Sequence, residues 1–244
     1  MNEELKDIAA NDEICIAFDC IKRGIEHIAK WNGKHNEYFI PLLLLSTGYE
    51  RLLKILLCLE YFDENASYPS TDYFSKYIAP AGKGHDIEIL LTKILATLKN
   101  TALYSYAPDR KADIEFLQND ENMKWAISLL KDFASHSRYY NLNTMIDNNK
   151  SKEDPWDSIS QLRNQYYMAH RHLQSEELLK DLTPFYREVH SYFIGTLQRF
   201  TRMLCFCFTQ GAFGSKARQV SAGLLDDFLR LKDEEIGDIS RLNL

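Results

Sequence analysis

The sequence predicts an all-α protein, an antiparallel helical bundle with an extra N-terminal helix and a C-terminal helical tail. Apolar residues recur at three- and four-residue steps through most of the chain, which is the spacing of one helix face. Stretches in which apolar and polar residues alternate, as in half-buried strands, are few. Helix start and stop residues separate the periodic segments. Together these observations favour helices packed around one core.

The composition indicates a folded chain without a broad basic surface. Its 244 residues are 45% hydrophobic and 26% charged, which is typical of a globular protein. The formal net charge of -6 argues against a protein that coats nucleic acid by electrostatics alone, although a local basic pocket remains possible. The polar, acidic start lacks the apolar segment of a secretory signal, so we expect a cytoplasmic protein.

Two apolar stretches, 40–62 and 191–208, raise the question of a membrane. Charged residues interrupt both of them, so neither offers about 20 residues compatible with lipid. We therefore expect buried helices and no membrane partner. The chain has five cysteines, an odd number that fits a reducing compartment. Cys205 and Cys207 could be half of a zinc site, but no paired ligands stand at a usual spacing nearby, and buried thiols are the better interpretation.

Three helices are expected in the first half of the chain. The first belongs to an N-terminal segment, 1–34, and should end near Asn32. The second begins near Pro41, a residue favoured in a first helical turn, and the third follows the turn at 80–84. Each has one apolar stripe, carried by Ile14, Ala17, Phe18, Ile21, Ile25 and Ile28, by Leu45, Tyr49, Leu52, Leu53, Leu56 and Leu57, and by Ile87, Leu90, Leu91, Ile94 and Leu98.

In the second half of the chain the sequence predicts three further helices and a tail. One helix begins around Asn119 or Asp120, and the polar stretch 137–154 is predicted to be a loop. Asp154 followed by Pro155 is a strong start signal. Another helix starts at Thr183-Pro184 and should be the longest of all, ending at 211. We expect one domain, 1–244, with its main bundle at 36–210 and a tail at 215–244 that packs on the body or on a second chain.

Arg163 and His170 form the candidate site. They are seven residues apart, about 700° of helical rotation, so they share one face of the helix that follows Asp154. A guanidinium can hold phosphoryl oxygens, and an imidazole with a pKa of about 6.5 can move a proton at neutral pH. The 2′-OH of RNA can supply the nucleophile, so cleavage needs no metal. On spacing alone, however, a solvated or structural pair is the more common explanation.

Several short motifs give this pair a context. Arg163-Asn164, five further residues and His170 resemble the motif of HEPN-superfamily ribonucleases. Glu50 and Lys54 look like the Glu/Lys-bearing helix of abortive-infection members of that family. The stretch 84–90 resembles the start of their middle helix, and 137–140 resembles the Arg-Tyr turn before their last helices. The resemblance extends from about residue 36 to 210.

The resemblance implies a helical bundle that dimerises and cleaves RNA without metal or cofactor. Arg163 would stabilise the phosphate, Asn164 would orient the phosphate or the arginine, and His170 would be the general acid/base. Six residues separate Arg163 from His170, the long end of the family's range. Active members are frequently toxins or antiphage and stress effectors. The implied partners are therefore RNA, a second copy of the chain, and an antitoxin or sensor protein.

Two hypotheses from different classes remain open. The first is the endoribonuclease, and the second is a catalytically inactive HEPN-like module that binds a nucleotide, RNA or a protein. A third, a di-metal carboxylate bundle, lacks the Glu-x-x-His pairs that it requires. Among the neighbouring residues, His172 is expected on the surface, and Tyr166 and Tyr167 are expected in packing rather than on a base. Glu50 and Lys54 by default stabilise their own helix.

Overall fold

The computed structural model describes residues 3–32, 34–100, 108–135, 137–147, 154–169, 181–221 and 226–241. Every regular element in these ranges is helical, which confirms the all-α prediction. The long helices are α1 (Glu3–Lys30), α2 (Phe39–Asn65), α4 (Ile87–Asn100), α6 (Pro108–Asn119), α7 (Glu121–Ser135), α9 (Pro155–Ala169) and α10 (Thr183–Thr209). The short elements are η1 (His35–Tyr38), α3 (Thr71–Tyr73), η2 (Phe74–Ile78), η3 (Ser137–Tyr139), α8 (Tyr140–Asp147), α11 (Gly214–Val220), α12 (Asp226–Leu229), η5 (Asp233–Glu235) and η6 (Ile239–Arg241).

Aspartate side chains fix the start of several helices. Oδ1 of Asp120 accepts hydrogen bonds from two backbone N–H groups of α7, those of Asn122 at 3.0 Å and Met123 at 2.9 Å. These bonds satisfy donors that have no partner within the helix. The start predicted near Asp120 is confirmed, whereas α2 begins two residues before Pro41. The prediction that α10 would be the longest helix is wrong, because it has 27 residues and α1 has 28.

Helices α1 and α2 pack along each other at very short range. A Cβ atom added to Gly48 of α2 would lie 2.7 Å from the carbonyl oxygen of Ala17 and 2.7 Å from Cγ1 of Ile21. Only glycine leaves room for this approach, because any larger residue would have to push the helices apart. The N-terminal helix is therefore part of the main core, to which it contributes six of its apolar residues, Ile14, Ala17, Phe18, Ile21, Ile25 and Ile28.

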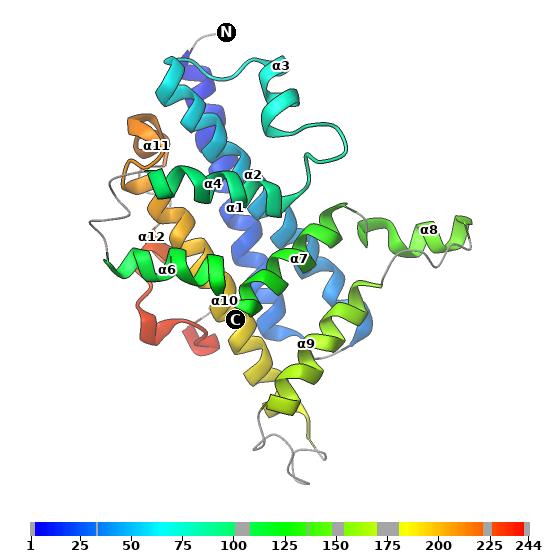
Figure 1. Ribbon diagram of the computed structural model, residues 1–244. Helices are drawn as coiled ribbons and strands as arrows, with labels where there is room; N and C mark the ends of the chain where they lie inside the picture. Colours follow the sequence, from blue (N-terminus) through cyan, green and yellow to red (C-terminus); the bar gives the residue numbers. More distant parts are fainter. Residues whose placement is uncertain are drawn as a thin grey trace.

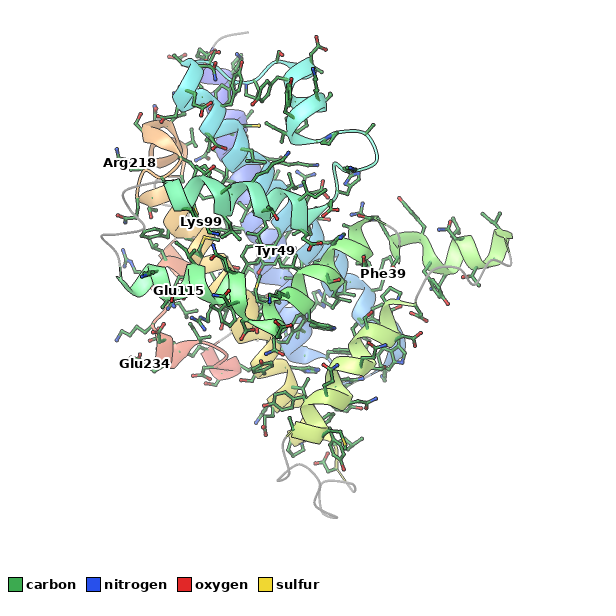
Figure 2. The ribbon with its side chains drawn as sticks, viewed as in Figure 1. Phe39, Tyr49, Lys99, Glu115, Arg218 and Glu234 are labelled. Carbon is green, nitrogen blue, oxygen red and sulfur yellow. The ribbon has the colours of Figure 1, made fainter. Side chains whose placement is uncertain are left out.

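The core is formed mainly by the buried apolar residues of α1, α2, α4, α7 and α10, which pack together in the body of the molecule (Figure 1). Tyr49, labelled in Figure 2, is fully buried in it and stacks on Phe200 at 4.5 Å between ring centroids. Its hydroxyl donates to the carbonyl oxygen of Leu197 at 3.0 Å and lies 2.9 Å from Oγ1 of Thr201. This buried phenol is thus satisfied, and the stacked pair joins the two helices at the centre of the bundle.

A buried ion pair connects α10 to α6. Arg202 and Asp113 are only 4% and 1% exposed. Nε of Arg202 donates to Oδ2 at 2.8 Å and Nη2 donates to Oδ1 at 2.7 Å, a bidentate arrangement. Arg202 also donates to the carbonyl oxygen of Leu231 at 2.8 Å and pairs with Asp233 at 2.7 Å. One arginine therefore holds α6 and the C-terminal tail against α10.

The stretch expected to be a loop after residue 136 is helical as far as 147. It forms η3 and α8, and α8 extends away from the body of the molecule (Figure 1). Leu142, Met145 and Ile146 stand at helical spacing and are 56%, 81% and 73% exposed. The prediction was wrong because it followed the polar residues of this segment and overlooked that spacing. Residues 148–153 of the predicted loop lie outside the described part.

The tail packs on the body, one of the two arrangements expected for it. Nδ2 of Asn11 in α1 donates to the carbonyl oxygen of Val220 at 2.8 Å, and Phe18 lies 6.1 Å from Phe228 between ring centroids. Leu224 and Leu225, also expected in this contact, lie outside the described residues. Among the helices that are described, none is both long enough and apolar enough to cross a membrane.

Candidate functional site

Helix α9 begins as the sequence predicts and carries Arg163 into the bundle. Oδ1 of Asp154 accepts the backbone N–H of Trp156 at 2.9 Å, and Pro155 is the first helical residue. Ile159 and Arg163 are four residues apart, so they lie on the same face of the helix. Both are buried, at 6% and 8% exposure. The inward face of α9 therefore presents a cation.

Three aromatic rings, which we call the aromatic cage, surround the Arg163 guanidinium. Its Cζ atom lies 4.4 Å from the ring centroid of Tyr186, 4.5 Å from that of Trp31 and 5.1 Å from that of Trp156. Trp31 follows α1, Trp156 belongs to α9, and Tyr186 belongs to α10. Cations are attracted to the faces of aromatic rings. The cage thus holds the charge at a junction of three helices without neutralising it.

Arg163 has no carboxylate partner within the ranges that the structure describes. Its Nε and Nη2 atoms are buried and make no hydrogen bond. Burial lowers the pKa of Arg163, because a charge is disfavoured away from water. A guanidinium nevertheless stays protonated at neutral pH. The site therefore contains a positive charge with two donor atoms that are unpaired and closed off from water.

His190 lies beside this arginine and is almost fully buried, at 3% exposure. Its ring stacks on Trp31 with 5.2 Å between centroids and 9° between planes. Its Nε2 atom has no hydrogen-bond partner. Burial and the nearby charge of Arg163 lower the pKa of His190 to about 4. The imidazole is consequently neutral at physiological pH.

A cavity of about 30 Å³ opens between these groups. Arg163, His190 and the ring of Trp31 lie beside it, but its wall is almost entirely apolar. Apolar residues from α1, α2 and α9, namely Ile28, Leu42 and Ile159, form much of the remaining wall, together with Val189 and Phe193 of α10. A charge facing such a wall is poorly screened, so it attracts an opposite charge more strongly than it would in water. The cavity is therefore an apolar space next to a buried, weakly screened cation.

The other residues predicted for the site do not gather around this cavity. Asn164 is exposed, since one residue further along a helix is about 100° around it from Arg163. His170 and His172 lie outside the described residues. The tyrosines that follow Asn164 pack between α9 and α10, as expected: Tyr166 donates to Glu188 at 3.0 Å and Tyr167 meets the edge of Phe185.

Glu50, Lys54 and His85 form a second cluster, which links α2 to the start of α4. Oε1 of Glu50 accepts from Nζ of Lys54 at 2.5 Å, and Nδ1 of His85 lies 3.0 Å from Oε2. Leu42 lines the Arg163 cavity, and Glu50 is eight residues further along α2, about 12 Å in rise. The cluster therefore holds two helices together at a distance from Arg163.

The cysteines offer no metal centre. Cys205 and Cys207 are both fully buried in α10, which agrees with the expectation of packed thiols. Burial raises the pKa of Cys207 above the usual range for a thiol, so it stays protonated. Within the described residues, no group of three or more His, Cys, Asp or Glu side chains is arranged to hold a metal ion.

The sequence singled out Arg163 but gave no local signal for its surroundings. His190 and Trp31 lie 27 residues after and 132 residues before it, and only the packing of α1 against α9 and α10 brings them together. The site that results is an apolar pocket beside one buried cation, built on the first nine residues of α9. No protein-family model, curated protein or solved structure matches this chain.

Proposed function

We propose that this chain is a metal-independent endoribonuclease of the HEPN type. Arg163 stabilises the phosphate, Asn164 orients the phosphate or the arginine, and His170 acts as general acid/base. The observation that carries the proposal is the state of Arg163: a buried cation with two donors that no described side chain occupies. A charge kept in this way is available to an anionic substrate.

The chemistry assigns a separate task to each group. The 2′-OH of RNA attacks the adjacent phosphorus, and negative charge grows on the phosphoryl oxygens as it does so. A fixed guanidinium near an apolar wall stabilises that charge without having to reorganise. His170 follows directly after the last residue of α9, Ala169. In the proposed reaction His170 takes the proton of the 2′-OH or returns one to the leaving oxygen.

The biological setting that we propose follows the same resemblance. The enzyme is a cytoplasmic toxin or an antiphage or stress effector, controlled by an antitoxin or sensor protein. It acts as a homodimer. The apolar side chains that α8 leaves exposed, Leu142, Met145 and Ile146, support an interface with a second copy, because contiguous exposed apolar residues mark interaction surfaces.

The second candidate is a catalytically inactive HEPN-like module that binds a nucleotide, RNA or a protein. One observation favours it: Arg163 is only 8% exposed and lies beneath the rings of the aromatic cage. A residue held in this way can fix a ligand without taking part in a reaction. Both candidates predict binding of an anion, and only the first predicts cleavage.

The test is cleavage of a mixed RNA pool in EDTA by the wild type and by His170→Ala. We expect the wild type to cut and the variant to lose activity by about 10²–10⁴-fold, the usual contribution of general acid–base catalysis. His172→Ala, two residues further along, is the matched control and should cut as fast as the wild type. A folded wild type that binds RNA without cutting it would favour the inactive module.

A further inference from the structure

Helix α8 and the turn before it carry the densest group of exposed large apolar side chains in the described part of the chain. Leu142, Met145 and Ile146 stand three and four residues apart on one face of α8, and Tyr139, just before the helix, is 62% exposed. The stretch 139–146 contains no charged residue. Because α8 extends away from the body (Figure 1), it presents a projecting, uncharged apolar surface.

A pocket of about 510 Å³ lies where α1 begins, between α1, α2 and the segment 68–74. We call it the α1–α2 pocket. Much of its wall is apolar and comes from Ala9 and Ala10 of α1, Ile55 and Leu59 of α2, and Phe74 of η2. Leu5, which also lines it, is 56% exposed, so the pocket is open to solvent. Its volume is within the range of binding pockets, about 300–1,000 Å³.

The charged side chains that line the α1–α2 pocket are already paired within the chain. Nζ of Lys6 donates to Oε1 of Glu3 at 2.9 Å. Oε1 of Glu13 accepts from Nη1 of Arg51 at 2.6 Å. Burial raises the pKa of Cys58, another lining residue, to about 12, so its thiol is neutral. The pocket therefore suits an uncharged apolar group better than an ion.

The projecting surface of α8 and the α1–α2 pocket match each other but do not meet within one chain. The apolar side chains of α8 are exposed, and α8 lies apart from the end of the molecule where α1 begins and where α3 lies (Figure 1). A helix whose anchors are three and four residues apart is a common ligand for an apolar groove. Docking the uncharged stretch 139–146 would bury no ion, which is costly without a partner.

We propose that Leu142, Met145 and Ile146 of one chain insert into the α1–α2 pocket of a second copy. This inference rests on the homodimer of the proposed function and adds the surface that receives α8. Each chain has one α8 and one pocket, so a two-fold axis makes two identical contacts. Such a dimer closes on itself and covers both apolar surfaces.

The test is sedimentation equilibrium of the full chain over a range of concentrations. Met145→Glu places a charge on α8, and Ala9→Lys places one in the α1–α2 pocket. Each should raise the dissociation constant of the dimer about 100-fold, because each contact then buries a charge without a partner. Both positions are exposed in the single chain, so both variants should fold.

Each variant has a matched control outside the two surfaces. Ile16→Glu makes an apolar-to-acidic change at a position of α1 that is 48% exposed and does not line the pocket. Ala96→Lys makes the basic change at an exposed position of α4. Both should dimerise as the wild type does. If either control dissociates as strongly as Met145→Glu and Ala9→Lys, the proposal is overturned.

Mixing the two variants gives the decisive result. In a dimer of Met145→Glu with Ala9→Lys, one contact pairs the introduced carboxylate with the introduced ammonium, and the other contact is unchanged. We expect this heterodimer to form within about tenfold of the wild-type affinity. If α8 instead packed on α8, Ala9→Lys alone would dimerise normally and the mixture would contain only its homodimers. That result, or assembly beyond a dimer, would overturn the proposal.

RNA cleavage in EDTA separates this inference from the proposed function. Restored dimerisation in the mixture, in a protein that cuts no RNA, would retain the docking of α8 and reject the ribonuclease. A wild type that cuts RNA but stays monomeric at every concentration would retain the ribonuclease and reject the docking. We expect cleavage to fall in each single variant and to return in the mixture.

Discussion

Two buried arginines in the same bundle have opposite surroundings. Arg202 is 4% exposed and is held by Asp113, Asp233 and a backbone carbonyl group. Arg163 is 8% exposed and faces three aromatic rings with no carboxylate among the described residues. Burial disfavours both charges, yet the bonds to Asp113 and Asp233 raise the pKa of Arg202, whereas the pKa of Arg163 is lowered.

This difference in partners indicates that Arg202 has a structural role, whereas Arg163 is not neutralised by the described part of the protein. A cation whose donors are filled by the protein cannot bind a ligand, and its contribution is to hold α6 and the tail in place. A cation that burial destabilises is retained at a cost to folding. Such a cost is common at functional sites, where a sequence departs from what stability alone would favour. Arg163 is therefore the better candidate for function.

The same substitution at the two positions should have the largest and most different effects. Arg202→Met leaves Asp113, which is 1% exposed, without its main cation. Breaking a buried pair in this way costs about 3–5 kcal/mol. We expect the lower end of that range, because Arg199 still lies 3.3 Å from Asp113. Urea unfolding measures the loss. A loss below about 1 kcal/mol would remove the contrast between the two arginines.

Arg163→Met should barely change the free energy of unfolding and should abolish function. Methionine fills the space between the rings without a charge, and replacing a buried charge by an apolar side chain is often neutral or stabilising. RNA cleavage should fall by about 10²–10³-fold, the usual effect of removing a donor that stabilises transition-state charge. Cleavage at the wild-type rate would show that Arg163 is structural after all. Arg187→Met is the exposed control.

The sequence predicts the helices that carry the two arginines better than it predicts the surroundings of either arginine. Asp154 and Pro155 mark the start of α9, and apolar spacing marks the core faces of α1 and α2, because both signals are local. The position of Arg163 on its helix follows from them. The burial of Arg163 does not follow from these local signals, because Trp31 and His190 contact it from distant segments of the chain. Likewise, Arg202 is one of the charged residues that interrupt the apolar stretch 191–208, and its partner Asp113 is 89 residues away, so no local signal predicts the pair.

The pH dependence of stability tests the electrostatic part of the comparison. The pKa of His190 is lowered from 6.5 to about 4 by burial and by Arg163. Between these values the unfolded chain binds more protons than the folded one, so stability rises with pH. The expected loss is about 1.5 kcal/mol as the pH falls from 6.5 to 5.

His190→Phe should remove this loss, whereas His27→Phe, at an exposed position of α1, should keep it. Arg163→Met should make it smaller, because the neighbouring charge is then gone. Urea unfolding at each pH provides the measurement. An identical slope in the wild type and in His190→Phe would mean that His190 is as well solvated as in the unfolded chain, contrary to its 3% exposure.

The smallest effect should come from weakening the aromatic cage while keeping its shape. Trp31→Phe retains a ring beneath Arg163 and beside His190, but it has a weaker π face and loses the Nε1–H bond to the carbonyl oxygen of Lys34, 2.9 Å long and exposed. We expect a loss of about 1 kcal/mol in stability and a few-fold loss in the rate of RNA cleavage. Trp125→Phe, whose ring packs on Phe193 at 5.6 Å, is the control and should leave the rate of RNA cleavage unchanged. If Trp31→Phe lowered stability alone, the cage would support the fold without holding Arg163 in place, and α9 itself would have to position the charge.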